Sequence, residues 1–130
     1  MKIFFFLFFL LGFLQAQIVV VTKNDSKIKK LQKEILQYLY LGKVDTIEGV
    51  RVRVLLSKDK KLHNDFCNKI LDKSTSQYNS YWARLVFTGK KFIAKRLTPK
   101  EIQTEMQEPN TITYIKRENL QKGWRILYEE

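Results

Sequence analysis

The apolar positions of the chain alternate between strand-like runs and helical spacing. Ile18–Thr22 (IVVVT) is an uninterrupted β-branched run, the pattern of a strand that is buried on both faces. Apolar residues then recur at helical spacing from Ile28 to Leu39, which predicts a helix that begins at Lys27 and ends at Gly42. A strand followed by a helix over this length is typical of the start of an α/β unit.

The middle of the chain repeats this order. Val50–Leu55 alternates between apolar and basic residues and then turns apolar, which predicts a second strand. Apolar residues four apart predict a helix over Lys60–Leu71. Another helix is expected to begin at a cap on Ser74 or Thr75 and to end at Gly89.

This last helix contains the stretch YWARLVFTG and carries a wide apolar stripe. The stripe residues fall at positions i, i+3, i+4, i+7 and i+8 and are Tyr78, Tyr81, Trp82, Leu85 and Val86. Aromatic residues at this spacing usually pack inward, whereas a stacking platform for bases would suit exposed strands or loops. We therefore expect these rings to be core anchors.

The final third predicts a basic linker, one helix and two strands. Lys90–Arg96 is the linker, and Thr98 begins a helix as a capping-box residue. Strands are expected at Thr111–Ile115 and Trp124–Tyr128, with a short helical turn at Glu118–Lys122 between them. The sum of these elements is a single three-layer α/β domain with a small mixed sheet flanked by helices.

The first sixteen residues have the features of a secretory signal. Lys2 precedes an apolar run of twelve residues from Ile3 to Leu14, which is shorter than the twenty or so that span a bilayer. Ala16 supplies a small residue for cleavage. We expect residues 1–16 to be removed and Gln17–Glu130 to form one periplasmic domain; the alternative is an uncleaved membrane anchor.

Charge and cysteine content narrow the function. The chain carries 24 Lys and Arg against 13 Asp and Glu, a formal net charge of +11. Such a balance suggests nucleic acid, an anionic surface or an anionic ligand as partner, and export argues against nucleic acid. The single cysteine, Cys67, excludes an intramolecular disulfide, so stability must come from the core.

Catalytic and metal-binding patterns are absent from the sequence. His63, the only histidine, lies four residues before Cys67, so the two side chains share a helix face. They could form a thiolate–imidazole pair, but quiet packing is the commoner outcome, and no third orienting group is evident. Neither metal-ligand spacing nor a glycine-rich phosphate fingerprint occurs. We expect a non-enzymatic protein without cofactor or metal.

Two polar loops are candidates for an anion site. Each leaves the carboxyl end of a predicted strand and leads to a helix N-terminus, where ligands of α/β proteins gather. Their hydroxyl, amide and ammonium groups suit an oxyanion. The candidate ligand-binding residues are Thr22, Asn24, Ser26, Ser57, Lys58, Lys60 and Lys61. For the lysines, the alternative is an ordinary solvated face.

YWARLVFTG closely resembles the "YWARLIFTG" signature of small phosphate ABC transporter substrate-binding-like proteins, and LQYLYLGK (Leu36–Lys43) is similar to their "LxxIFLGK" helix end. The resemblance implies one lobe of a type II periplasmic-binding fold and phosphate or a similar oxyanion as ligand. Three places differ from the family. Ser57–Leu62 has one serine and no glycine where the family's phosphate loop would lie, and Thr113 stands where glycine is usual. Lys90, Lys91 and Phe92 replace the family's proline-rich piece after FTG.

Three functions follow from these patterns. The first is an oxyanion-binding periplasmic domain whose exposed site is covered by a homodimer partner or by a membrane protein. The second is a ligand-free interaction module that docks on an envelope sensor or transporter. The third, a nucleic-acid binder, rests on charge alone.

Overall fold

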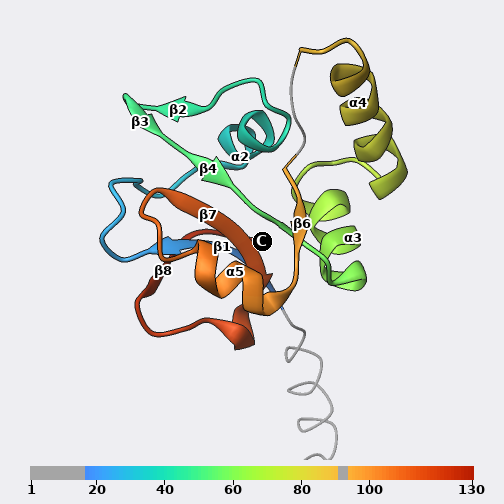
Figure 1. The fold of residues 1–130 in the computed structure, drawn as a ribbon. Coiled ribbons are helices and arrows are strands. Elements are labelled where there is room, and N and C mark those ends of the chain that lie inside the picture. Colours follow the sequence, from blue (N-terminus) through green and yellow to red (C-terminus); the bar gives the residue numbers. More distant parts are fainter. Residues whose placement is uncertain (1–16, 91–93) are drawn as a thin grey trace, which may run out of the picture.

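The computed structural model describes residues 17–90 and 94–130, so the predicted signal segment 1–16 lies outside the described residues. The described chain forms eight strands and five helical elements (Figure 1). In chain order these are β1 (Ile18–Lys23), α2 (Lys33–Tyr40), β2 (Thr46–Ile47), β3 (Val50–Arg51), β4 (Arg53–Val54), β5 (Leu56–Ser57), α3 (Lys60–Lys69), α4 (Thr75–Phe87), β6 (Arg96–Leu97), α5 (Pro99–Glu105), β7 (Thr111–Lys116), the 3₁₀ helix η1 (Arg117–Asn119) and β8 (Trp124–Glu129).

The main sheet has four strands in the order β4-β7-β1-β8. β1 lies between β7 and β8 and is antiparallel to both, whereas β4 is parallel to β7. It follows that β1 and β4 run in opposite directions. β5 pairs with β6 in a separate parallel ladder, and β2 with β3 in a short antiparallel one.

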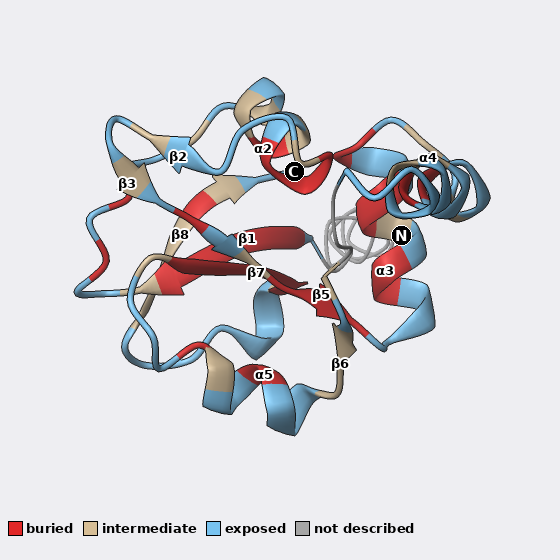
Figure 2. Ribbon diagram, turned by 45° about the horizontal axis from the view of Figure 1, so that its top comes forward, coloured by how far each residue is buried: buried red, intermediate tan, exposed pale blue. Residues whose placement is uncertain are grey.

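The sheet is the middle one of three layers. On one face, residues of α2, α3 and α4 pack with Ile18, Val20 and Tyr114 of the sheet. On the other face, Ile102 and Met106 pack against Val19 and Val21, which alternate with Ile18 and Val20 along β1. Figure 2 shows β1 and β7 buried between these layers. The predicted three-layer α/β fold with a small mixed sheet is therefore confirmed, as is the burial of the first strand on both faces.

The aromatic stripe of YWARLVFTG fastens α4 to the end of α2. Tyr78 Oη and Trp82 Nε1 both donate to the carbonyl of Tyr40, at 2.8 and 3.2 Å, and Tyr81 Oη donates to the carbonyl of Leu41 at 2.6 Å. Tyr78 and Trp82 are buried. The prediction of core anchors is confirmed for these rings, and the hydrogen bonds satisfy carbonyls that a helix end leaves without intrahelical partners.

Three predicted elements differ from the structure. The first helix begins at Lys33 rather than Lys27, because the preceding segment is extended and Leu31 N donates to Leu127 O of β8 at 3.0 Å. Val50–Leu55 is not one strand but is divided between β3 and β4. Part of the predicted basic linker, Arg96, belongs to β6, while 91–93 lie outside the described residues.

Candidate functional site

The two predicted oxyanion loops lie at opposite ends of the sheet. Thr22 pairs with Ile112, near the start of β7, and the loop that follows β1 leaves the sheet there. Val54 of β4 also pairs with Ile112, but β4 runs parallel to β7. The chain after Val54 therefore runs toward the end of β7, and Ser57 lies level with that end. The three residues from Val54 to Ser57 correspond to about 10 Å along the strand. The structure therefore does not bring the two groups together.

In the first loop, the hydroxyl groups hold the fold together. Thr22 and Ser26 are buried, and their hydroxyls are hydrogen-bonded to each other at 2.8 Å. The Thr111 carbonyl, 2.7 Å from Thr22 Oγ1, can only accept, so it takes the Thr22 proton and Ser26 donates to Thr22. Ser26 Oγ also accepts from Asn110 N at 2.8 Å. This chain of bonds ties the loop to the start of β7.

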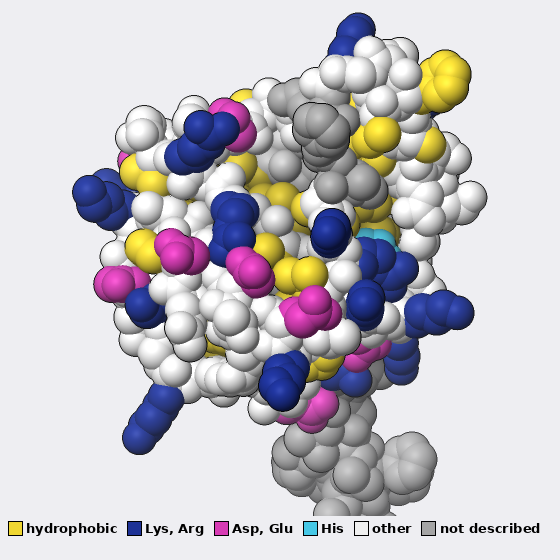
Figure 3. All heavy atoms as spheres, in the orientation of Figure 1, with side chains coloured by type: hydrophobic (Ala, Val, Ile, Leu, Met, Phe, Trp, Pro, Cys, Tyr) yellow, Lys and Arg dark blue, Asp and Glu magenta, His cyan; other side chains and the backbone are white. Residues whose placement is uncertain are grey.

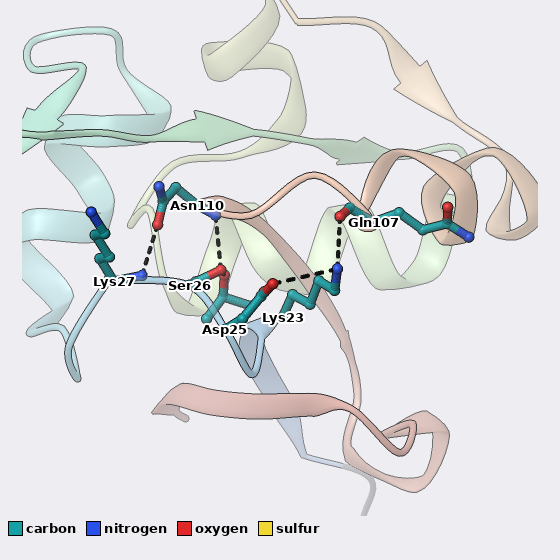
Figure 4. A network of polar contacts seen from close by, with 7 residues as sticks. Lys23, Asp25, Ser26, Lys27, Gln107 and Asn110 are labelled. Carbon is teal, nitrogen blue, oxygen red and sulfur yellow. Dashed lines mark hydrogen bonds and ion pairs between the residues drawn. The ribbon is translucent and has the colours of Figure 1, made fainter.

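Further contacts strengthen the same junction (Figure 4). Asn110 Oδ1 accepts from Lys27 N at 2.8 Å, and the Lys23 ammonium group donates to the carbonyl of Gln107 at 3.1 Å. Asn24 is exposed, and its N–H donates to Gly123 O at 2.7 Å. The loop is thus a structural junction in which only the Asn24 side chain is exposed among the three predicted ligand-binding residues.

The second loop keeps its predicted residues together. Ser57 is buried and is followed by the exposed Lys58, Lys60 and Lys61 at the N-terminus of α3. Ser57 Oγ accepts from the N–H of Asp59 at 3.1 Å, which leaves its own proton available to a ligand. The sequence analysis gave no role to Asp59, whose carboxylate caps α3 by accepting from Leu62 N. The Asp59 carboxylate thus already occupies part of the position in which this helix N-terminus would bind an anionic ligand.

The Ser57 backbone is held by a buried polar network. Its N–H donates to Tyr114 Oη at 2.8 Å, and its carbonyl accepts from Arg96 Nε at 2.8 Å. Tyr114 Oη is also hydrogen-bonded to His63 Nδ1. Tyr114 Oη accepts from Ser57 N and can donate its own proton to His63 Nδ1, an arrangement in which the imidazole proton lies on Nε2. Burial raises the pKa of Tyr114, so the ring stays a neutral donor.

His63 and Cys67 are packed rather than activated. Cys67 Sγ lies 3.7 Å from His63 Nε2, and both side chains are buried. Burial, and secondly the nearby Arg96 guanidinium, lowers the pKa of His63 to about 4, whereas burial raises the pKa of Cys67. Both shifts oppose the thiolate–imidazolium form, which favours the interpretation as quiet packing even though Tyr114 is hydrogen-bonded to the imidazole.

A pocket that the sequence analysis did not predict lies beside the second loop. It has a volume of about 340 Å³, and Ser57, Asp59, Tyr114, Lys116 and Trp124 contribute to its lining. These residues come from three separate segments, so no local sequence pattern marks them. Within residues 17–90 and 94–130, no group of His, Cys, Asp and Glu side chains could hold a metal ion, and no helix is long and apolar enough to cross a membrane.

On the face seen in Figure 3, the Lys and Arg side chains of the described residues do not form one continuous stripe. They are scattered there and interleaved with Asp and Glu. Among the described residues, ion pairs such as Arg53–Glu105, with 2.6 Å between nitrogen and oxygen, neutralise part of the basic charge. The charge pattern on this face is unlike the continuous groove that tracks a nucleic-acid backbone.

Solved structures show what this arrangement resembles. A chain assigned as a phosphate ABC transporter substrate-binding protein from Clostridium perfringens, solved with bound phosphate, is 14% identical with a TM-score of 0.65. An ABC-type phosphate transport receptor from Vibrio cholerae is 9% identical with a TM-score of 0.58, and PstS from Borrelia burgdorferi is 13% identical with a TM-score of 0.59. The chain has a phosphate-binding-protein-like fold.

This phosphate-binding-protein-like fold is only part of the fold of those proteins. The matches cover 86% of this chain but 44%, 45% and 46% of the three solved chains, in the order given. No family model matches the chain, and no curated protein matches it. The chain thus corresponds to a partial lobe, and at these identities the likeness extends to the fold alone.

Proposed function

We propose that this chain is a periplasmic, non-enzymatic domain that binds phosphate or a similar oxyanion weakly through the loop Ser57–Lys61. The observation that carries the proposal is the group of three exposed lysines around a buried serine at the N-terminus of α3, in a fold like that of phosphate-binding proteins. A role in phosphate uptake or sensing would follow from the same likeness.

In this proposal Ser57 orients the anion and the lysines supply charge. The Ser57 hydroxyl donates to one oxygen, while Lys58, Lys60 and Lys61 neutralise the others. Each contact contributes less than in a closed cleft, because half of a two-lobed site leaves the anion in water. A second copy of the chain or a membrane protein of the transport system would supply the missing cover.

The first loop has a smaller part in the proposal. The hydroxyls of Thr22 and Ser26 are hydrogen-bonded to each other and to the backbone of Asn110 and Thr111 at the start of β7. They would therefore affect a ligand only indirectly, by keeping their loop in place. Asn24 remains as an exposed amide at the far end of the sheet. A single phosphate would not contact both loops.

The test is the melting temperature of the purified protein, titrated with phosphate against sulfate and chloride at fixed ionic strength. A ligand that binds only the folded state raises the melting temperature, by an amount set by RT ln(1 + [L]/Kd). We expect a phosphate-selective rise at millimolar concentrations that Ser57→Ala or the double change Lys58→Gln/Lys61→Gln reduces.

The matched control is Lys29→Gln, which removes an equally exposed lysine from the segment before α2. This change should leave the phosphate effect intact, because a site-specific effect does not depend on net charge alone. Equal loss in all variants, or no selective rise in the unmodified protein, would contradict the proposal.

A ligand-free interaction module is the second candidate function. Phe87, at the end of α4, is 92% exposed, and the neighbouring Val86 is 42% exposed. Exposed apolar residues of this kind mark protein contacts more often than small-ligand sites. This candidate predicts no phosphate effect and instead co-purification with a particular envelope transporter or sensor, which Phe87→Ser should abolish while the melting temperature stays unchanged.

A further inference from the structure

The pocket of about 340 Å³ beside the second loop differs in chemistry from a phosphate site. It lies on the α5 face of the sheet, between α5, the end of β7, the connection from β7 to β8 and the N-terminus of α3. Its volume falls at the lower end of the range for small-molecule sites, about 300–1,000 Å³. A ligand of roughly ten heavy atoms would fit the pocket on this scale.

The pocket has an apolar floor. Leu62 comes from α3, Ile102 from α5, Ile115 from β7 and Trp124 from β8. Leu62, Ile102 and Ile115 belong to the buried core, so this part of the lining is held rigidly. Trp124 is half-buried and adds an indole ring to the floor. A small aliphatic or thioether group would gain free energy by leaving water here.

Two charged side chains of opposite sign line the same pocket. Asp59 is the N-cap of α3, and Lys116 is the last residue of β7. In the described part of the chain they form no ion pair with each other or with another residue. Only one Asp59 oxygen, Oδ1, is engaged by Leu62 N, so the other is left to accept from a ligand.

We propose that this pocket binds a small zwitterion with an apolar side chain, such as a free apolar α-amino acid. The ligand's ammonium group donates to Asp59, its carboxylate accepts from Lys116, and its side chain lies on the apolar floor around Trp124. The amides of Gln103, Asn119 and Gln121 at the rim add hydrogen bonds. Phosphate is disfavoured in the pocket, because the two charges sum to zero and Asp59 repels an anion.

This site goes beyond the phosphate proposal and does not depend on it. Ser57 and Asp59 belong both to the second loop and to the pocket lining, whereas Lys58, Lys60 and Lys61 do not line the pocket and Lys116 is not part of the loop. Variants of Lys116 on one side, and of Lys58 and Lys61 on the other, therefore distinguish the two activities.

The experiment is isothermal titration of the purified protein with leucine, methionine and phenylalanine. Tryptophan fluorescence, measured in the Trp82→Phe variant so that Trp124 is the remaining tryptophan, is the readout at the pocket. Isoamylamine and 4-methylpentanoate are the decisive controls, because each has the leucine side chain with one of the two charges. We expect saturable binding of at least one amino acid, a change in fluorescence, and binding at least about tenfold weaker for both single-charge analogues.

Two variants locate the site. Asp59→Asn and Lys116→Gln should each weaken binding at least about tenfold. Asparagine is as good an N-cap as aspartate, so α3 remains folded in the first variant. The double change Lys58→Gln/Lys61→Gln is the matched control and should leave amino-acid binding unchanged.

Three results would overturn the inference: no saturable binding of any of the three amino acids, equal binding of a single-charge analogue, or binding that survives both Asp59→Asn and Lys116→Gln. The phosphate effect on the melting temperature, measured in the same variants, is expected to persist in Lys116→Gln. Each of the two proposals can therefore be refuted without refuting the other.

Discussion

The buried His63 makes stability depend on pH in a predictable direction. Its folded-state pKa of about 4 lies below the ordinary value of 6.5, so the unfolded chain binds more protons between these two values. Stability is therefore fully present above pH 6.5 and is lost as the pH falls toward 4. The groups around the ring are Tyr114, Cys67, Arg96 and Tyr78, and none of them is a carboxylate that could compensate.

The magnitude follows from the two pKa values. A full difference of 6.5 − 4 corresponds to about 3 kcal/mol, reached only below pH 4. At pH 5, where most carboxylates remain ionised, the expected loss relative to pH 7.5 is about 2 kcal/mol. That is a large share of the 5–15 kcal/mol or so that stabilises a typical domain.

The assay is urea unfolding at closely spaced pH values between 7.5 and 5, followed by far-UV circular dichroism. His63 is the only histidine of the chain, so His63→Gln removes the main group that titrates in this range. We expect the variant to be less stable at pH 7.5 but to have a nearly flat pH profile. Two results would refute the assignment of a neutral, buried imidazole: a free energy of unfolding of the unmodified protein that does not change between pH 7.5 and 5, or an equal change with pH in His63→Gln.

Further predictions concern side chains with unusual surroundings. Thr113 Oγ1 is a buried hydroxyl without a hydrogen-bond partner within the described structure, so Thr113→Val should raise the free energy of unfolding by about 1 kcal/mol. Thr22→Val removes a hydrogen-bonded hydroxyl and should lower the free energy of unfolding by about 1–2 kcal/mol. Both changes are measured by the same urea assay. Gly42 has φ +68°, and a Cβ there would lie 2.6 Å from Trp82 Cη2, so Gly42→Ala should lower the melting temperature well beyond the effect of Gly89→Ala. Gly89 has a similar φ of +73°, and none of the described residues would lie within 4 Å of a Cβ there. Equal effects at the two glycines would show that the clash with Trp82 is relieved at little cost.

The sequence predicted the elements better than their pairing. The buried strand β1, the cap of α4 at Ser74, the capping box of α5 and the aromatic rings of α4 all depend on local spacing, and all are present. Val86, the last residue of the predicted apolar stripe, is exposed instead. The start of α2 was wrong because Ile28 and Leu31 lie at helical spacing by coincidence. Ile28 is buried from an extended segment, and Leu31 N is bonded to β8. Tertiary packing outweighed the local pattern there.

The candidate site shows the same limit more sharply. That Thr22 and Ser57 lie at or near strand ends is visible in the sequence, and the structure places them within β1 and β5. Whether β1 and β4 run in the same direction depends on β7, which is encoded more than fifty residues after Ser57. Tyr114, Arg96 and Lys116 were missed for the same reason. Their relation to Ser57 and Asp59 exists only once the sheet has formed, so no motif could have marked them.

The position of β1 at the centre of the sheet also sets when the domain can fold. Both of its neighbours come from the end of the chain: Ile18 pairs with Lys116, and Val19 pairs with Glu129. Synthesis must therefore reach β7 before the first strand has a partner on either side. Closing loops of this length slows folding relative to a domain built from local contacts. The main sheet can thus form only after β7 has been synthesised, later than the helices α2, α3, α4 and α5 that cover it.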